Sequence, residues 1–205
     1  MPVGTLRGAS IVVLILGVLG GHTAANAVGG EPFMTTAGRT AQPIGHYEFC
    51  QRYADECNVK SRDGARVRLT PDLWAQLVAV NDTVNRTVVP TTDEVIFGRE
   101  EVWSYPAGFG DCEDIALLKR RTLIAKGWPV GALLITVVRQ RNGEGHAILT
   151  VLTDRGDLVL DNLDPRVRVW SDTSYQFVKR QSQFNTGQWA TINDGRATSV
   201  GSLSR

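Results

Sequence analysis

The chain has 205 residues, 42% of them hydrophobic, and its 22 basic and 21 acidic residues give a formal net charge of +1. This length suits one domain with a substantial core, and there is no internal repeat or low-complexity block. The near-zero charge excludes the strongly basic surface typical of proteins that bind nucleic acid or anionic membranes, so we expect neither as a partner.

The first 27 residues have the pattern of a secretory signal peptide: Arg7, an apolar run at 11–20 and the small-residue site "ANA" that ends at Ala27. We expect cleavage after Ala27 and export to the periplasm. The apolar run is too short to span a bilayer comfortably, so we expect no stable membrane insertion after cleavage. An uncleaved N-terminal anchor is the alternative.

Residues 28–45 are rich in Gly, Thr and Pro without periodicity, which predicts a flexible N-terminal arm. We expect the folded domain at 46–193 and a flexible tail at 194–205.

The segment "TPDLWAQLVAVNDTVNRTVV" predicts a helix. Thr70 is suited to the N-cap and Pro71 to the first helical position. Apolar residues follow at helical spacing, at positions 73, 77, 80, 84 and 88.

Residues 90–111 contain several Gly and Pro and no sustained period, which predicts a connecting loop. The following "CEDIALLKRRTLIAKG" predicts a second helix, with acidic residues in its first turn and Gly127 as its stop signal.

Three β-rich runs come next, at 132–138, 146–152 and 157–163, and predict an antiparallel meander. Further strands are expected at "VRVW" and "GQWATI". Helices followed by antiparallel strands indicate an α+β fold in which N-terminal helices pack on an antiparallel sheet.

The three cysteines are Cys50, Cys57 and Cys112. In an oxidising compartment the local pair Cys50 and Cys57 is expected to form a disulfide, and two buried free thiols are the alternative. A straight helix would hold the pair about 10 Å apart, beyond the bridging limit of about 7 Å, so this segment is expected to bend.

Cys112 is the candidate nucleophile. It is expected in the first turn of its helix, where free backbone amides and the helix dipole favour a thiolate. Its neighbours Asp111, Glu113 and Asp114 would oppose ionisation. The alternative is that Cys112 is buried and packs as a small hydrophobic side chain, without a role in catalysis.

A thiolate nucleophile needs an imidazole partner, and the mature chain offers His46 and His146. We favour His146, which begins a strand, although a histidine at a strand start can be structural. If the hairpin turns at 154–155, Asp161 lies opposite position 148 and shares a face with His146. Asp161 could then orient the imidazole, but a one-residue slip would separate the two, and Asp161 is otherwise a turn residue.

Four motifs in order, "GDCED-ALLK", "GWP", "EGHAILTV" and "GDLVLDNL", resemble the bacterial transglutaminase-like cysteine peptidases, the family that includes the LapG-type periplasmic proteases. The similarity covers residues 47–192. It implies a papain-like or transglutaminase-like core and a Cys-His-Asp triad at Cys112, His146 and Asp161. Ile115 replaces the tyrosine that commonly follows "GDCED".

The resemblance also implies a bound Ca²⁺ held by carboxylates that flank the nucleophile, which points to Asp111, Glu113 and Asp114. A divalent cation would offset the charge that opposes ionisation of Cys112. Three carboxylates are few for an ion that takes about 6 to 8 oxygens. The alternative is that Asp111 caps the helix and the other two are favourable first-turn acids.

The expected function is therefore a periplasmic cysteine endopeptidase, calcium-dependent and acting on an exported or surface-associated protein. In LapG-type members the substrate is a surface adhesin that holds cells in a biofilm, and an inner-membrane cyclic-di-GMP receptor restrains the protease. The alternatives are a transglutaminase or amide-exchange enzyme and a non-catalytic calcium-binding module. Asn81 and Asn85 are candidates for a second oxyanion donor.

Overall fold

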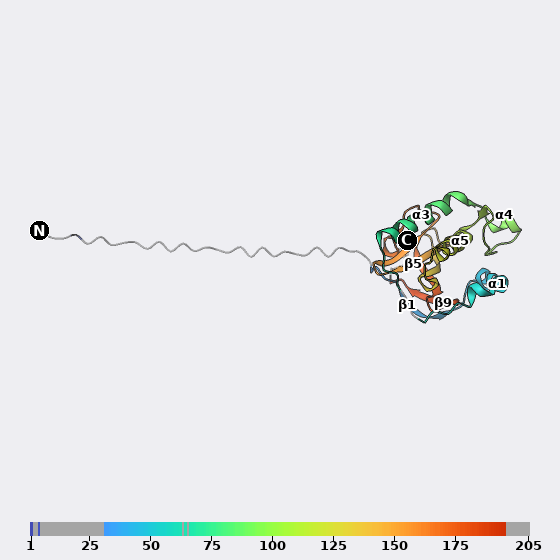
Figure 1. Ribbon diagram of the computed structural model, residues 1–205, viewed down its shortest axis with the longest axis horizontal. Helices are drawn as coiled ribbons and strands as arrows, with labels where there is room; N and C mark the ends of the chain where they lie inside the picture. The colour runs from blue at the N-terminus through green and yellow to red at the C-terminus, as the bar shows by residue number, and fades with distance from the viewer. Residues whose placement is uncertain (2–3, 5–30, 63, 65, 196–205) are drawn as a thin grey trace, which may run out of the picture.

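The computed structural model of the protein describes residues 1, 4, 31–62, 64 and 66–195 (Figure 1). The expected signal peptide at 1–27 lies outside the described residues except for positions 1 and 4, and so does the tail from 196 onward. Within the described part of the chain, no helix is long and apolar enough to cross a membrane.

The two helices expected from the sequence are confirmed. The helices are α1 (Ile44–Arg52), α2 (Ala54–Cys57), α3 (Pro71–Thr87), α4 (Asp93–Phe97) and α5 (Cys112–Ala125), with short 3-10 turns η1 (Val130–Ala132) and η2 (Trp170–Asp172). At the start of α3, the Thr70 hydroxyl accepts a hydrogen bond from the backbone N–H of Leu73, so the N-cap is formed as expected.

A seven-stranded sheet forms the second layer of the molecule. Its strands are β1 (Thr35–Thr40), β4 (Leu133–Arg139), β5 (Gly145–Thr153), β6 (Gly156–Leu160), β7 (Arg168–Val169), β8 (Gln176–Ser182) and β9 (Asn185–Asn193). The order is β1-β9-β8-β4-β5-β6-β7, and every neighbouring pair is antiparallel. The α+β fold and the β4-β5-β6 meander are confirmed.

The main core lies between the sheet and the helices. Helix α5 packs on β4 and β5, and α3 packs on α5 (Figure 1). Along β5, Leu149 and Val151 belong to this core, whereas Ile148 belongs to a second cluster with Val159 and Phe177. The two-residue period of a strand therefore places apolar side chains on both faces of the sheet.

The β5–β6 hairpin has the register expected from its two-residue turn. Leu149 pairs with Leu160, and Thr153 pairs with Gly156. Gly156 has φ +131°, a conformation that L side chains rarely adopt, and this glycine follows the turn at 154–155. The register places Asp161, the residue after β6, opposite position 148.

The expectation of a loose arm at 28–45 is wrong for residues 35–40 and 44–45. Residues 35–40 form β1, which pairs with β9 at the sheet edge, and α1 begins at Ile44. The side chains of β1 are exposed, so its sequence "TTAGRT" carries no apolar alternation. Backbone hydrogen bonds to a strand about 150 residues away hold it in place, and these depend on the tertiary fold.

The connecting loop expected at 90–111 contains local structure. It includes α4 and ends in β3 (Phe109–Gly110), which pairs in parallel with β2 (Val89–Pro90). Trp103 within it is buried in the main core. This segment therefore has a fixed path past the start of α5.

Candidate active site

A cleft of about 890 Å³ lies where the N-terminus of α5 meets the start of β5. Cys112, His146 and Ala147 line it, together with the carboxylates of Asp93, Asp111 and Glu113. The cleft therefore contains two of the three expected catalytic residues and two of the three expected metal ligands.

Cys112 is the first residue of α5 and is the one cysteine outside a disulfide. Its Sγ lies 3.4 Å from the backbone N of Ala147, which donates to it, and 3.2 Å from Oε2 of Glu113, to which it donates. Burial and the charge of Glu113 raise the pKa of Cys112 well above its ordinary range. Without a compensating cation, the thiol keeps its proton.

His146 and Asp161 are in direct contact. Nε2 of His146 lies 2.8 Å from Oδ1 of Asp161, and both side chains are buried. If Nε2 carries the proton that this hydrogen bond needs, Nδ1 of the neutral ring is left as an acceptor. No hydrogen bond between His146 and Cys112 occurs among the described residues. The backbone N–H of Ala147, the residue after His146, donates to Sγ of Cys112 instead.

The Asp161 carboxylate is fully provided with donors. Oδ1 also accepts from the backbone N of Leu163 at 3.0 Å, and Oδ2 accepts from the hydroxyl of Tyr175 at 2.5 Å. Burial alone would raise the pKa of Asp161, but these bonds and that from His146 hold it below its ordinary value. The carboxylate is therefore a stable anion beside the imidazole.

Asn81 and Asn85 have structural partners instead of facing the thiol. The Asn85 side-chain amide donates to the backbone O of Asp161 at 2.8 Å, and that of Asn81 donates to the backbone O of Pro165 at 3.0 Å. Neither lines the cleft. They tie α3 to the segment after β6 and are not placed as oxyanion donors.

Three carboxylates converge beside the thiol. One oxygen each of Asp93, Asp111 and Glu113 lies within 4.8 Å of the other two. Oδ2 of Asp93 accepts from the backbone N of Val102, but Oδ1 of Asp93 and Oδ1 of Asp111 are buried without a hydrogen-bond partner among the described residues. Buried anionic oxygens without donors are costly unless a cation binds them.

This acid cluster also shifts proton affinities. Burial is the main cause that raises the pKa of Asp111 and of Glu113, and their mutual proximity raises that of Glu113 further. Carboxylate oxygens are the ligands that Ca²⁺ prefers, and this cluster brings three carboxylates together. The cluster therefore fits a calcium ion, with backbone oxygens and water needed to complete the shell.

Asp114 does not join the cluster. Its Oδ1 accepts from the backbone N of Ser104 at 2.6 Å, so it fixes the loop that precedes α5. Asp93, in contrast, was not expected from the sequence. It begins α4, and "TTDEV" is a helix-start pattern that could have drawn attention to it. No local sequence pattern connects it with Cys112, because the two residues are far apart along the chain.

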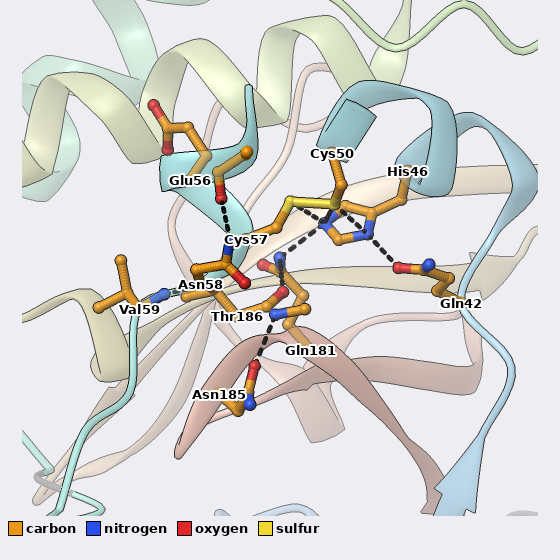
Figure 2. Close-up of a disulfide and its surroundings, with 12 residues drawn as sticks. Gln42, His46, Cys50, Glu56, Cys57, Asn58, Val59, Gln181, Asn185 and Thr186 are labelled. Carbon is orange, nitrogen blue, oxygen red and sulfur yellow. Dashed lines mark hydrogen bonds between the residues drawn. A yellow bond between two sulfur atoms is a disulfide. The ribbon is translucent and has the colours of Figure 1, made fainter. Parts of the chain in front are cut away.

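His46, the other histidine considered, lies beside the disulfide (Figure 2). The Cys50–Cys57 disulfide is confirmed, with the two Cα atoms 5.6 Å apart, and the chain bends between α1 and α2 as expected. Nδ1 of His46 lies 3.5 Å from Sγ of Cys50 and 3.0 Å from the acceptor Oε1 of Gln42, and Nε1 of Trp189 donates to it at 3.2 Å. Nε2 of His46 lies 3.0 Å from Nε2 of Gln181. Burial, followed by the charge of Arg120, lowers the pKa of His46 to about 4.

Comparison with known proteins identifies the family. A family model described as bacterial transglutaminase-like cysteine proteinase matches residues 36–197, a range that includes all of β1 except Thr35. No curated protein matches the chain.

Solved structures of LapG are similar to this chain. Calcium-bound LapG of Legionella pneumophila has 27% identity and a TM-score of 0.51, with 77% of this chain and 92% of that chain covered. EGTA-treated LapG from the same organism has 26% identity and a TM-score of 0.50, with 74% and 80% covered.

Proposed function

Because the chain belongs to the bacterial transglutaminase-like cysteine proteinases, and is therefore a hydrolase, we propose that Cys112, His146 and Asp161 are its catalytic triad. The observation that carries this proposal is the buried His146–Asp161 pair, with Nε2 and Oδ1 2.8 Å apart. His146 lines the same cleft as Cys112, the only free thiol of the described chain. A nucleophile, a base and an orienting group within one site is the arrangement that thiol peptidases require.

In the proposed reaction, Nδ1 of His146 takes the proton of Cys112 and the thiolate attacks a peptide carbonyl carbon. The backbone N–H groups at the start of α5 stabilise the oxyanion. The imidazolium then protonates the departing amine, which leaves a thioester on Cys112. Water, deprotonated by His146, attacks the thioester and releases the acid and the free thiol. Asp161 holds the ring and stabilises its charged form throughout.

We further propose that Asp93, Asp111 and Glu113 hold a calcium ion. The support is the pair of buried carboxylate oxygens, one of Asp93 and one of Asp111, that have no donor in the described part of the chain, together with the likeness to calcium-bound LapG. A bound divalent cation would offset the negative charge beside the thiol. Asp114, which bonds to Ser104, is left out of this ligand set.

The calcium proposal is tested by titrating Ca²⁺ into the purified protein by calorimetry and by melting it with and without EGTA. At free calcium one hundred times Kd, binding would stabilise the fold by about 2.7 kcal/mol, a rise in Tm of about 5–10 °C. Asp93→Asn should abolish most of this rise, and Glu94→Gln, its neighbour on α4, should keep it. An unchanged Tm in EGTA would contradict the site.

The proposed setting is the periplasm, and the proposed substrate is an exported or surface-associated protein such as an adhesin. The secretory pattern of the first 27 residues and the likeness to LapG support this. A membrane-bound regulatory receptor is the corresponding proposed partner.

The experiment that identifies the substrate compares peptides in the culture supernatant and the envelope of bacteria that carry the wild-type chain or Cys112→Ala. Cleavage that disappears in the variant names the substrate. Incorporation of a labelled amine without hydrolysis would contradict the endopeptidase proposal, because the thioester would then be resolved by amine transfer.

A further inference from the structure

The second oxygen of the buried Asp161 carboxylate has a partner outside the proposed triad. Oδ1 faces His146 and the backbone N of Leu163, whereas Oδ2 accepts a hydrogen bond from the Tyr175 hydroxyl at 2.5 Å. Bonds between a hydroxyl and an ionised carboxylate are short and about twice as strong as neutral ones. Tyr175 thus makes the closest polar contact of this carboxylate.

We propose that Tyr175 is a positioning residue of the active site, which holds the Asp161 carboxylate in the rotation that directs Oδ1 at His146. A carboxylate turns readily about its terminal torsion, and a donor on each oxygen removes this freedom. The inference rests on the proposed triad, because it assigns Tyr175 a role that acts through Asp161.

The place of Tyr175 in the fold supports this role. It lies directly before β8, between η2 and Phe177, and it packs against the apolar cluster that contains Trp170 and Phe177. Its ring centroid is 5.5 Å from that of His146. One rigid side chain therefore contacts both the base and the group that orients the base.

The Tyr175 hydroxyl is also suited to act as a constant donor. Burial, followed by the hydrogen bond to Asp161, raises the pKa of Tyr175 above its ordinary value. At neutral pH, where Asp161 is ionised, the phenol therefore keeps its proton and is the donor of this hydrogen bond.

Tyr175 is separated from the substrate side. It does not line the cleft of Cys112; it lines a pocket of about 220 Å³ behind Asp161, with Ser174 and Arg166. A residue in this place has no contact with a substrate in the cleft. Its loss should lower the rate of the chemical step and leave substrate affinity unchanged.

The test uses iodoacetamide, whose reaction with Cys112 reports how well His146 maintains the thiolate; the other two cysteines are in a disulfide. In the folded, calcium-supplied protein, Tyr175→Phe should lower the second-order alkylation rate about tenfold, the scale of losing one hydrogen bond to a charged group. Tyr53→Phe, a tyrosine that packs on Phe49 outside the cleft, is the matched control and should match wild type.

A double-mutant cycle separates positioning from packing. Asp161→Ala removes the group through which Tyr175 acts, so Tyr175→Phe should have no further effect in that background. Equal effects of Tyr175→Phe in both backgrounds would overturn the proposal, because independent sites are additive.

Two other outcomes are equally decisive. If wild-type Cys112 does not react at all, the triad proposal itself fails; if it reacts and Tyr175→Phe reacts equally fast, the inference about Tyr175 alone fails. Should Tyr175→Phe not fold, NMR of the wild type answers the question: a protected phenolic proton of Tyr175 that is lost in Asp161→Ala supports the bond, and its absence overturns it.

Discussion

The described chain has two buried histidines, each beside sulfur, and their surroundings differ. His146 bonds a buried carboxylate and lies next to the residue whose amide contacts Cys112. His46 lies against the Cys50–Cys57 disulfide, beside the neutral side chains of Gln42 and Gln181 (Figure 2). The neutral Trp189 ring donates to it as well. A histidine near sulfur is therefore not sufficient for a thiol site.

The difference lies in the charged partner. Asp161 is an anion that favours the imidazolium formed when His146 takes a proton. Burial and Arg120 lower the pKa of His46 to about 4, so that ring is neutral at neutral pH and is a poor proton acceptor. Under the proposed triad, a buried histidine thus takes part in the chemistry at position 146, whereas at position 46 it contributes only to packing.

Exchange of each histidine for glutamine is the strongest test of this contrast. His146→Gln should lower hydrolysis of the identified substrate by more than about 10⁴-fold, because it removes the base. His46→Gln should leave the rate of the folded protein unchanged. Initial rates, with circular dichroism to verify folding, measure both; a comparable loss of rate in the two variants would contradict the distinction.

Loss of the negative charge of Asp161 is expected to have the next largest effect on the rate of hydrolysis. Asp161→Asn keeps the shape of the side chain but removes its negative charge, and the rate should fall about 10³- to 10⁴-fold. Single-turnover kinetics would locate the loss in the chemical step. Asp164→Asn, whose carboxylate pairs with Arg166 and Arg168, is the control and should retain activity.

The Cys50–Cys57 disulfide beside His46 is expected to stabilise the fold and to take no part in catalysis. Replacing Cys50 and Cys57 by serine should destabilise the fold by about 2.5 kcal/mol, the loop-entropy value for a closure this short. Urea unfolding measures the change. Loss of Cys112 alkylation in the folded double variant would show that the disulfide also shapes the active site.

The smallest expected effect is a pH dependence of stability due to His46. Its folded pKa of about 4 lies below the ordinary value of 6.5, so the unfolded state takes up the proton first as pH falls. The stability from neutral His46 is present above pH 6.5 and is lost towards pH 4, by about 2 kcal/mol at pH 5.

Urea unfolding at pH 8 and pH 5 compares wild type with His46→Gln, which lacks this titration and should lose correspondingly less stability. Equal losses in the two proteins would show that carboxylates alone cause the acid sensitivity.

Much of the site could be predicted from local patterns. Cys112 at a helix start, the meander with His146 at the start of a strand, and the hairpin register that brings Asp161 opposite position 148 all depend on nearby residues. The disulfide pair is similarly close in sequence. Helix spacing, turn length and strand alternation are short-range constraints, so one sequence contains them.

The sequence by itself therefore determined the fold class, the disulfide and the three residues proposed for catalysis. Tertiary structure decided that Asp93 and not Asp114 meets Asp111 and Glu113, that Tyr175 caps Asp161, and that residues 35–40 form an edge strand. These contacts join segments that have no local signal for one another. They form only when the packed core brings the segments together, because the free energy that holds them comes from burial and long-range pairing.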